Sequence, residues 1–182
     1  MLVGGASRRF GSPKALARLD GETLAERAWR VLGEACDERL AVGKVADGLA
    51  LPFALVDDGV EVRAPLAGVV AGLRAATHEI AVFLPVDVPL VRPELLRELG
   101  AACADAAVTQ TGPLPAAFHK RTLRVLERRL AGRDLALRAA LEELDVRVVD
   151  VEPTELRNVN ARADLAALRR RRRRARARHP CR

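Results

Sequence analysis

The sequence predicts a single α/β domain in which a mostly parallel sheet is covered by helices on both faces. Three observations lead to this fold class. Short apolar segments alternate with amphipathic helical segments along the chain, and no repeat or linker interrupts them. The 182 residues, 49% of them hydrophobic and 30% charged, are enough for one full core. Three polar clusters follow apolar segments, as expected where parallel strands end at a common edge.

The first apolar segment is short. Leu2 and Val3 precede a loop at 4–14 that is rich in glycine and basic residues. Because a core strand usually has about five residues, this strand is either a stub or continues upstream of Met1, and we favour the second interpretation. The next element is a helix over 20–35. Thr23 and Glu26 form a capping box there, and one helix face is shared by Leu24, Ala28, Val31, Leu32 and Ala35.

The remaining elements alternate in the same way. Buried strands are predicted at 39–42, 53–56, 79–89, 106–110 and 146–151. Helices are predicted at 65–76, 92–104, 120–130, 134–144 and 160–170. Pro65 stands in the first turn of its helix, where a missing N–H costs nothing. The segment at 79–89 is the clearest core strand.

The formal net charge of +7 belongs to one end of the chain. Nine arginines lie at or after Arg169, and without them 22 basic residues face 24 acidic ones, a net charge of −2. We therefore separate a domain at 1–168 from a basic tail at 169–182, expected to be disordered or a frayed helix end because its charges repel one another. The tail could bind RNA, DNA or an acidic membrane loosely. Only 3% of the residues are aromatic, which argues against specific nucleic-acid binding.

The cellular location of the protein is predicted from its apolar segments, its N-terminus and its cysteines. No apolar run approaches the roughly 20 residues that span a bilayer, and the order of regions in a signal peptide is missing. Cys36, Cys103 and Cys181 form neither a disulfide framework nor a metal-binding pattern. We expect a cytoplasmic protein without a membrane partner. We also expect a monomer, because the sequence shows no uncovered apolar stripe.

The loop at 4–14 has the composition of an anion site. Its glycines let a ligand approach the backbone N–H groups, and its basic residues supply positive charge. The residues concerned are Gly4, Gly5, Arg8, Arg9, Gly11 and Lys14. The spacing fits neither a Walker A loop nor the dinucleotide-binding fingerprint, but the combination suits a triphosphate. The alternative is a mobile basic terminus.

Acidic residues follow two of the predicted strands. Asp87 ends the apolar segment at 79–89, where a carboxylate needs a partner or a cation. Mg²⁺ typically binds one or two carboxylates together with substrate phosphates. Asp57 and Asp58 follow the strand at 53–56, although Asp-Asp-Gly is also an ordinary turn sequence. Since no serine has a histidine near it in sequence, covalent catalysis is disfavoured. Phosphoryl or nucleotidyl transfer needs only positioning and charge neutralisation.

Four segments carry a family resemblance: LVGGASRRFGSPKALARLDGETL, DDGVEVRAPLAGVVAGL, FLPVDVPLVRPELL and RNVNARADL. In this order they resemble the molybdenum cofactor guanylyltransferases, the MobA family of nucleotidyltransferases, from Leu2 to Leu165. The resemblance implies a three-layer α/β/α, Rossmann-like fold of the nucleotide-diphospho-sugar transferase type. It also implies a Mg²⁺-dependent guanylyltransferase that moves GMP from GTP to the terminal phosphate of molybdenum-molybdopterin and releases pyrophosphate.

The resemblance further implies roles for single residues. The expected GTP-binding residues are Leu2, Val3, Gly4, Gly5, Lys14, Asp58 and Asp87. The expected catalytic residues are Arg9, Lys14 and Asp87. In these roles Arg9 and Lys14, with support from Arg8, neutralise the triphosphate. Asp58 helps to hold the nucleoside, and Asp87 carries Mg²⁺ beside the GTP.

Asn158 and Asn160 match the asparagines that the family places near the pterin. The chain departs from the family pattern at two places. Where the family often has an asparagine that contacts nucleotide, Val42 and Gly43 stand here. The threonine, proline and glutamate that follow the last asparagine in the family are replaced, which is expected to weaken a helix cap. The replacing residues are Ala161, Arg162 and Ala163.

Three alternative functions stay open from the sequence. A cytidylyltransferase for the same cofactor typically resembles Leu-Ala-Ala-Gly where this chain has Leu-Val-Gly-Gly, so Gly4 favours guanine. A second alternative is another sugar-nucleotide type of nucleotidyltransferase. The third, from a different class, is a nucleic-acid-binding protein that acts through the arginine-rich tail. Besides GTP and molybdenum-molybdopterin, molybdoenzymes or cofactor-handling proteins are the partners to consider.

Overall fold

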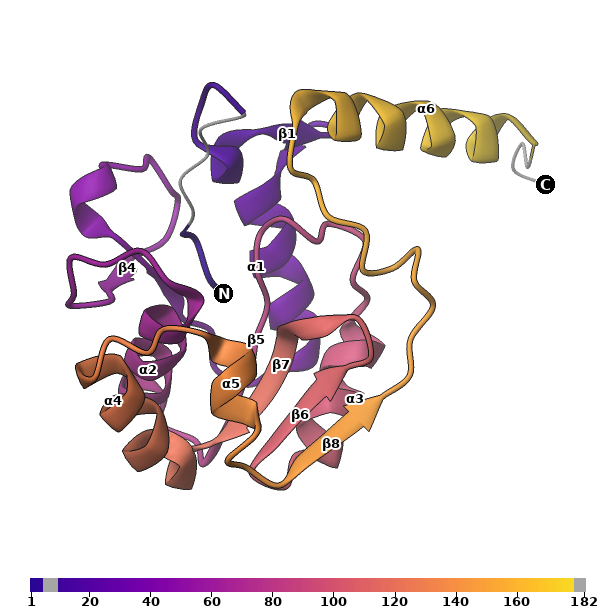
Figure 1. Ribbon diagram of the computed structural model, residues 1–182. Coiled ribbons are helices and arrows are strands. Elements are labelled where there is room, and N and C mark those ends of the chain that lie inside the picture. Colours follow the sequence, from indigo (N-terminus) through magenta and orange to yellow (C-terminus); the bar gives the residue numbers. More distant parts are fainter. Residues whose placement is uncertain (5–9, 179–182) are drawn as a thin grey trace.

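The computed structural model describes residues 1–4 and 10–178, with side chains described as far as Arg171 (Figure 1). The strands are β1 (Arg18–Leu19), β2 (Glu22–Thr23), β3 (Ala41–Gly43), β4 (Leu55–Asp57), β5 (Ile80–Phe83), β6 (Ala106–Thr109), β7 (Gly112–His119) and β8 (Val146–Val149). The α-helices are α1 (Leu24–Ala35), α2 (Pro65–Ala75), α3 (Pro93–Ala102), α4 (Leu123–Ala131), α5 (Leu137–Leu141) and α6 (Arg162–Arg178). Short 3₁₀ turns are η1 (Lys14–Leu16), η2 (Val45–Asp47) and η3 (Lys120–Thr122).

The central sheet is mostly parallel, as the sequence predicts. β3 runs parallel to β4, and β6 runs parallel to β8. Leu2 forms parallel bridges with Val42 on one side and with Pro85 on the other. The N-terminal residues therefore join the β3–β4 pair to the four-stranded part, whose order is β5-β7-β6-β8. β7 is the exception, because it runs antiparallel to both β5 and β6.

Helices cover both faces of the sheet and make the three layers (Figure 1). α1 and α3 contribute to one hydrophobic core, while α2, α4 and α5 contribute to the other. The strands supply both cores by alternation, since successive side chains point to opposite faces. On β6, for example, Ala106 and Val108 belong to the α2 side and Ala107 to the α1 side. The predicted fold class is confirmed.

Helix α1 begins where its sequence predicts. The side chain of Thr23 accepts a hydrogen bond from the Glu26 backbone N–H at 3.0 Å, and the Glu26 carboxylate accepts one from the Thr23 backbone N–H at 2.8 Å. This capping box satisfies two N–H groups that the first helical turn leaves without partners. It fixes the start of the helix that follows the loop at 4–14.

Helix α2 lies unusually close to the sheet. A Cβ atom built on Gly72 would lie 2.6 Å from Cε1 of Phe83, and one built on Gly68 would lie 2.9 Å from a methyl carbon of Leu2. Both distances are too short for ordinary packing. The two glycines therefore let α2 press on β5 and on the N-terminal strand, which carry the loops of the candidate site.

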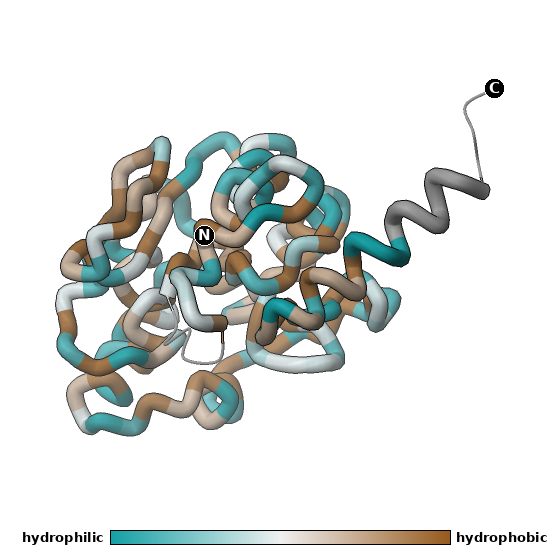
Figure 2. Tube along the Cα trace, turned by 90° about the horizontal axis from the view of Figure 1, so that it is seen from above, coloured by the Kyte–Doolittle hydropathy of each residue, from teal (hydrophilic) through white to brown (hydrophobic). Residues whose placement is uncertain are grey.

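Helix α6 crosses the boundary at which the sequence separates domain from tail. Leu165 and Leu168 are buried in the core on the α1 side, whereas Arg169, Arg170 and Arg171 are exposed. The helix continues to Arg178 and projects from the domain (Figure 1), and Figure 2 shows that it is hydrophilic (teal) where it leaves the domain. The basic segment thus starts as a helical extension of the folded domain.

Candidate active site

A lysine, an aspartate and an asparagine from three distant segments meet at the carboxyl edge of the sheet. The Nζ of Lys14 donates hydrogen bonds to Oδ2 of Asp87 at 3.3 Å and to Oδ1 of Asn160 at 3.1 Å. The side chains of Lys14 and Asp87 are 18% and 29% exposed, so a ligand can reach both. We call Lys14, Asp87 and Asn160 the Lys14 cluster.

The backbone that carries Lys14 is held on both sides. Pro13 precedes it and has φ of −55°, and the Pro13 carbonyl accepts a hydrogen bond from Leu16 N–H at 3.1 Å. Phe10 is buried, and its carbonyl accepts a hydrogen bond from Nε of Arg162 at 3.1 Å. The second half of the glycine-rich loop is therefore anchored to the start of α6.

Asp87 is placed by the extension of β5. Leu2 donates its N–H to the Leu84 carbonyl at 2.9 Å and accepts from Val86 N–H at 3.3 Å. The carbonyl of Asp87 then accepts a hydrogen bond from Val159 N–H at 2.7 Å. This last bond holds the segment that carries Asn158 and Asn160 against Asp87.

The two asparagines expected near the pterin differ in their surroundings. Both are exposed to solvent, but Asn160 also accepts a hydrogen bond from Lys14 and so belongs to the Lys14 cluster. Asp164 caps α6 by accepting hydrogen bonds from the N–H groups of Asn160 and Ala161 at 2.9 and 2.8 Å. These two bonds lower the pKa of the Asp164 carboxyl below its usual value. Asp164 thereby fixes the backbone that leads into α6, whereas Ala161, just before the helix, has no side-chain oxygen that could accept a hydrogen bond from the first turn.

Glu155 anchors the same segment, and sequence reasoning missed it. This residue is 7% exposed, and its carboxylate accepts hydrogen bonds from the backbone N–H and from Nε of Arg92, each at 3.0 Å. Arg92 is the N-cap residue of α3. A glutamate between two predicted elements gives no signal of burial, so only the structure reveals the contact.

The N-terminal strand brings its backbone to the same edge. Val3 donates its N–H to the Val42 carbonyl at 2.8 Å, which makes the short segment a central member of the sheet. Gly4 is exposed, and a Cβ there would meet no atom of the described residues within 4 Å. A ligand can therefore approach the Gly4 backbone. Gly5, Arg8 and Arg9 lie outside the described residues, so their expected roles stay predictions.

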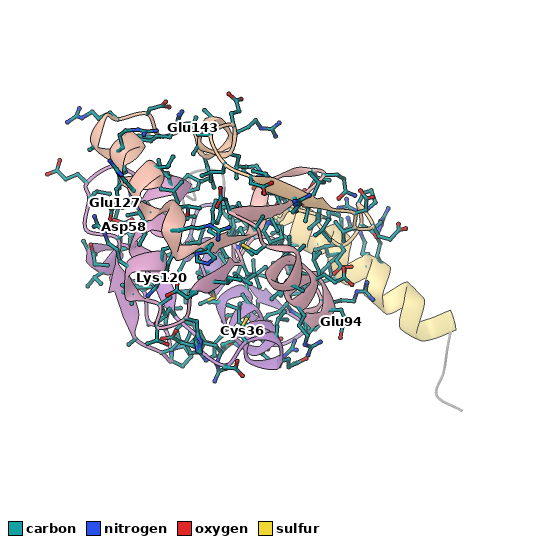
Figure 3. The ribbon with its side chains drawn as sticks, turned by 90° about the horizontal axis from the view of Figure 1, so that it is seen from below. Cys36, Asp58, Glu94, Lys120, Glu127 and Glu143 are labelled. Carbon is teal, nitrogen blue, oxygen red and sulfur yellow. The ribbon has the colours of Figure 1, made fainter. Side chains whose placement is uncertain are left out.

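The two acidic residues at the end of β4, Asp57 and Asp58, have different environments. Asp57 is exposed and accepts hydrogen bonds from the N–H groups of Val45 and Gly59, which lower the pKa of its carboxyl. Asp58, which is labelled in Figure 3, follows it directly and has a side chain that is only 8% exposed. Its Oδ1 accepts a hydrogen bond from Nζ of Lys44 at 2.5 Å. Lys44 was missed in the sequence, although it follows the strand at 39–42 by two residues.

The cysteine thiols in the described part of the chain are not activated for nucleophilic chemistry. Burial raises the pKa of the Cys36 and Cys103 thiols, which disfavours their reactive thiolate forms. Residues 1–4 and 10–178 hold no group of three or more histidine, cysteine, aspartate or glutamate residues that could bind a metal by itself. Among the helices described here, none has the length and apolar character needed to cross a membrane.

Comparison with known proteins identifies the family. A family model described as the MobA-like NTP transferase domain matches residues 1–148. The chain belongs to this family. A member from Burkholderia vietnamiensis, named molybdenum cofactor guanylyltransferase, is 34% identical over 193 residues, covering 94% of each chain. A protein of the same name from Desulfosudis oleivorans is 30% identical over 182 residues, covering 91% of this chain and 90% of the relative.

A solved structure shares the MobA-like fold. Molybdopterin-guanine dinucleotide biosynthesis protein A from Archaeoglobus fulgidus superposes with a TM-score of 0.76 at 26% identity. The match covers 95% of this chain and 97% of that one. The resemblance read from the four sequence segments is thereby confirmed at the level of the family and the fold.

Proposed function

We propose that this MobA-like transferase moves GMP from GTP to the terminal phosphate of molybdenum-molybdopterin and releases pyrophosphate. The observation that carries the proposal is the Lys14 cluster, which places a cation, a carboxylate and an amide oxygen beside the exposed Gly4 end of a central strand. The names of the relatives at 30% and 34% identity support the same reaction.

Basic side chains of this chain can neutralise the negative charge that develops during the transfer of GMP. An oxygen of the pterin phosphate attacks the α-phosphorus of GTP, the bond from that phosphorus to the β-phosphate oxygen breaks, and pyrophosphate leaves with its added negative charge. Lys14 can exchange its contact with Asp87 for a contact with the phosphates, because both partners are partly exposed. A cation positioned in this way stabilises charge that develops in the transition state. Arg9 is proposed to act beside it.

Asp87 is the residue that we propose would hold Mg²⁺. The donor set fits this ion in one specific way: a single carboxylate is enough when the substrate phosphates supply other oxygen ligands. When bound, Mg²⁺ would offset negative charge on the phosphates and on the leaving pyrophosphate. Release of Asp87 from Lys14 by the incoming triphosphate would free its Oδ2 for this purpose.

The proposal also covers the residues that bind the nucleotide, the choice of GTP and the place of the reaction in the cell. Gly4 and the carbonyl of Val3 would meet the nucleotide through the backbone, and Asp58 would hold the nucleoside. Leu2, whose N–H and carbonyl pair with Leu84 and Val86, would hold this segment in place. We prefer GTP to CTP because this chain has Gly4 at the position where the pattern of the cytidylyltransferases for this cofactor, Leu-Ala-Ala-Gly, has alanine. Calorimetric titration with GTP and CTP at equal concentration tests this choice, and equal affinities or a preference for CTP would contradict it. Because both proposed substrates are intracellular metabolites, we propose a cytoplasmic reaction.

The main test of the reaction is the Asp87→Asn variant. We expect it to fold normally and to lose GTP-dependent guanylation by about a hundredfold or more, because the cation site is gone. Asp150→Asn is the matched control, since Asp150 is exposed and follows β8, and it should react at the wild-type rate. Near-normal pterin-dependent release of pyrophosphate by Asp87→Asn would overturn the assignment of the metal site.

A further inference from the structure

Lys44 is a buried lysine with no task in the mechanism above. It follows β3 directly and is 9% exposed. Its Nζ donates to Oδ1 of Asp58 and to the backbone carbonyl of Val60. The ion pair with Asp58 is largely removed from water. Such a pair costs desolvation energy and is often no more stable than two packed apolar residues, so stability alone does not account for it.

The contact with Lys44 fixes one oxygen of the Asp58 carboxylate. Within the described part of the chain, both hydrogen bonds to this side chain use Oδ1, the second coming from Val60 N–H at 3.3 Å. A charge-assisted bond holds the carboxylate against rotation. Oδ2 is thereby kept in one orientation, as an acceptor for the N–H groups of a base or the hydroxyls of a ribose.

The backbone around Asp58 is held without the side chain of Lys44. Asp58 N–H donates to the Gly43 carbonyl at 3.1 Å. The Asp57 carboxylate accepts from Val45 N–H and from Gly59 N–H, each at 2.8 Å. These bonds tie the turn after β4 to the end of β3. Removal of the Lys44 ammonium therefore takes away its bonds to the Asp58 carboxylate and to the Val60 carbonyl, but it leaves the bonds of Asp57 and Gly43 that hold the turn.

Gly43, the last residue of β3, has no room for a side chain, so the polar side-chain atoms at the end of this strand come from another residue. A Cβ on Gly43 would lie only 3.0 Å from the backbone oxygen of Val3. The end of β3 is thus packed against the N-terminal strand too closely for a side chain at this position. Polar side-chain atoms at this strand end must come from adjacent positions. Asp58 is one of these: its backbone N–H donates to the Gly43 carbonyl, and its carboxylate is largely buried.

We propose that Lys44 is a positioning residue for nucleotide binding. By holding Oδ1 of Asp58, it orients the carboxylate that receives the nucleoside part of GTP. This inference rests on the proposed function. Because the nucleoside does not change during the transfer, its contacts stabilise the ground state and the transition state equally. Their loss raises KM and leaves kcat unchanged.

The test compares Lys44→Met with a control on the same two loops. Arg63 donates to Asp47 at 2.8 Å and joins these loops through a pair whose arginine side chain is 45% exposed. For Lys44→Met we expect KM and Kd for GTP to rise about tenfold or more, with kcat within about twofold of wild type. Arg63→Met should change none of these values by more than about twofold. If Lys44→Met does not fold, Lys44→Gln replaces it with the same expected direction.

The double variant Lys44→Met/Asp58→Asn separates positioning from stability. Without either charge it should regain the melting temperature that Lys44→Met loses, yet bind GTP as weakly as Asp58→Asn. Recovery of GTP affinity in the double variant, or an unchanged KM in folded Lys44→Met, overturns the inference while leaving the proposed function intact. A wild-type protein that neither binds GTP nor releases pyrophosphate from it overturns both.

Discussion

Replacement of Lys14 by methionine removes the central cation of the Lys14 cluster and keeps a similar side-chain length. The lost ground-state interaction is small, because Lys14 and Asp87 are 3.3 Å apart and partly exposed. Pairs of this kind contribute about 0–1 kcal/mol. For a chain of this size that corresponds to a fall in melting temperature of at most about 4 °C. The fold should therefore be retained.

The effect of Lys14→Met on the reaction should be much larger. A group positioned on charge that develops during phosphoryl transfer contributes roughly 3–4 kcal/mol, which is a loss of about 10²–10³ in rate. The assay is pterin-dependent release of pyrophosphate from GTP, measured beside thermal unfolding. Lys120→Met is the control, since Lys120 lies in η3, outside the Lys14 cluster. A well-folded Lys14→Met protein that reacts at nearly the wild-type rate would refute the reasoning.

Three further predictions follow from other contacts. Deletion of Arg169–Arg182 should leave guanylation of free pterin intact, whereas a nucleic-acid-binding protein acting through its tail would lose function; turnover of the truncated chain decides between them. Asp164→Ala should lower the melting temperature at pH 7. Hydrogen bonds hold the Asp164 pKa below 3.8, so its stabilisation is complete above that value and is lost as the pH falls through the lower folded pKa. The difference from wild type, followed by thermal unfolding from pH 7 to 3, should therefore shrink. Gly72→Val should destabilise the fold by about 1–3 kcal/mol in urea unfolding, because its side chain would overlap Phe83, and wild-type stability would show that α2 can move away.

Elements with local signals were predictable from the sequence. The capping box of Thr23 and Glu26 and the apolar face that follows it lie within one short segment, and α1 forms there. β7 lacked such a signal and was not predicted. It spans Gly112–His119 and contains two prolines and two alanines, residues that are poor strand formers by themselves. Pairing with β5 and β6 on both sides makes it a strand.

The candidate site was predictable in its residue types more than in its contacts. Lys14, Asp87 and Asn160 stood out because polar residues followed apolar strands or matched a family motif. Their direct contact spans 73 and 146 residues of sequence, and no local pattern encodes it. Lys44 shows the opposite case. A lysine two residues after a predicted strand is typical of an exposed loop, and Lys44 is buried only because the loops after β3 and β4 pack around it.

The anchoring of the glycine-rich loop by the start of α6 has a consequence for synthesis of the protein. Phe10 and Lys14 leave the ribosome early, but their partners Arg162 and Asn160 follow 152 and 146 residues later. At translation rates of about 5–20 residues per second, the loop waits roughly 8–30 s for these contacts. The nucleotide site therefore gains its last contacts only after the final strand, β8, has been synthesised. A nascent chain, or a fragment cut before Asn160, would lack the partners that complete the site and also Leu165 and Leu168 of the core.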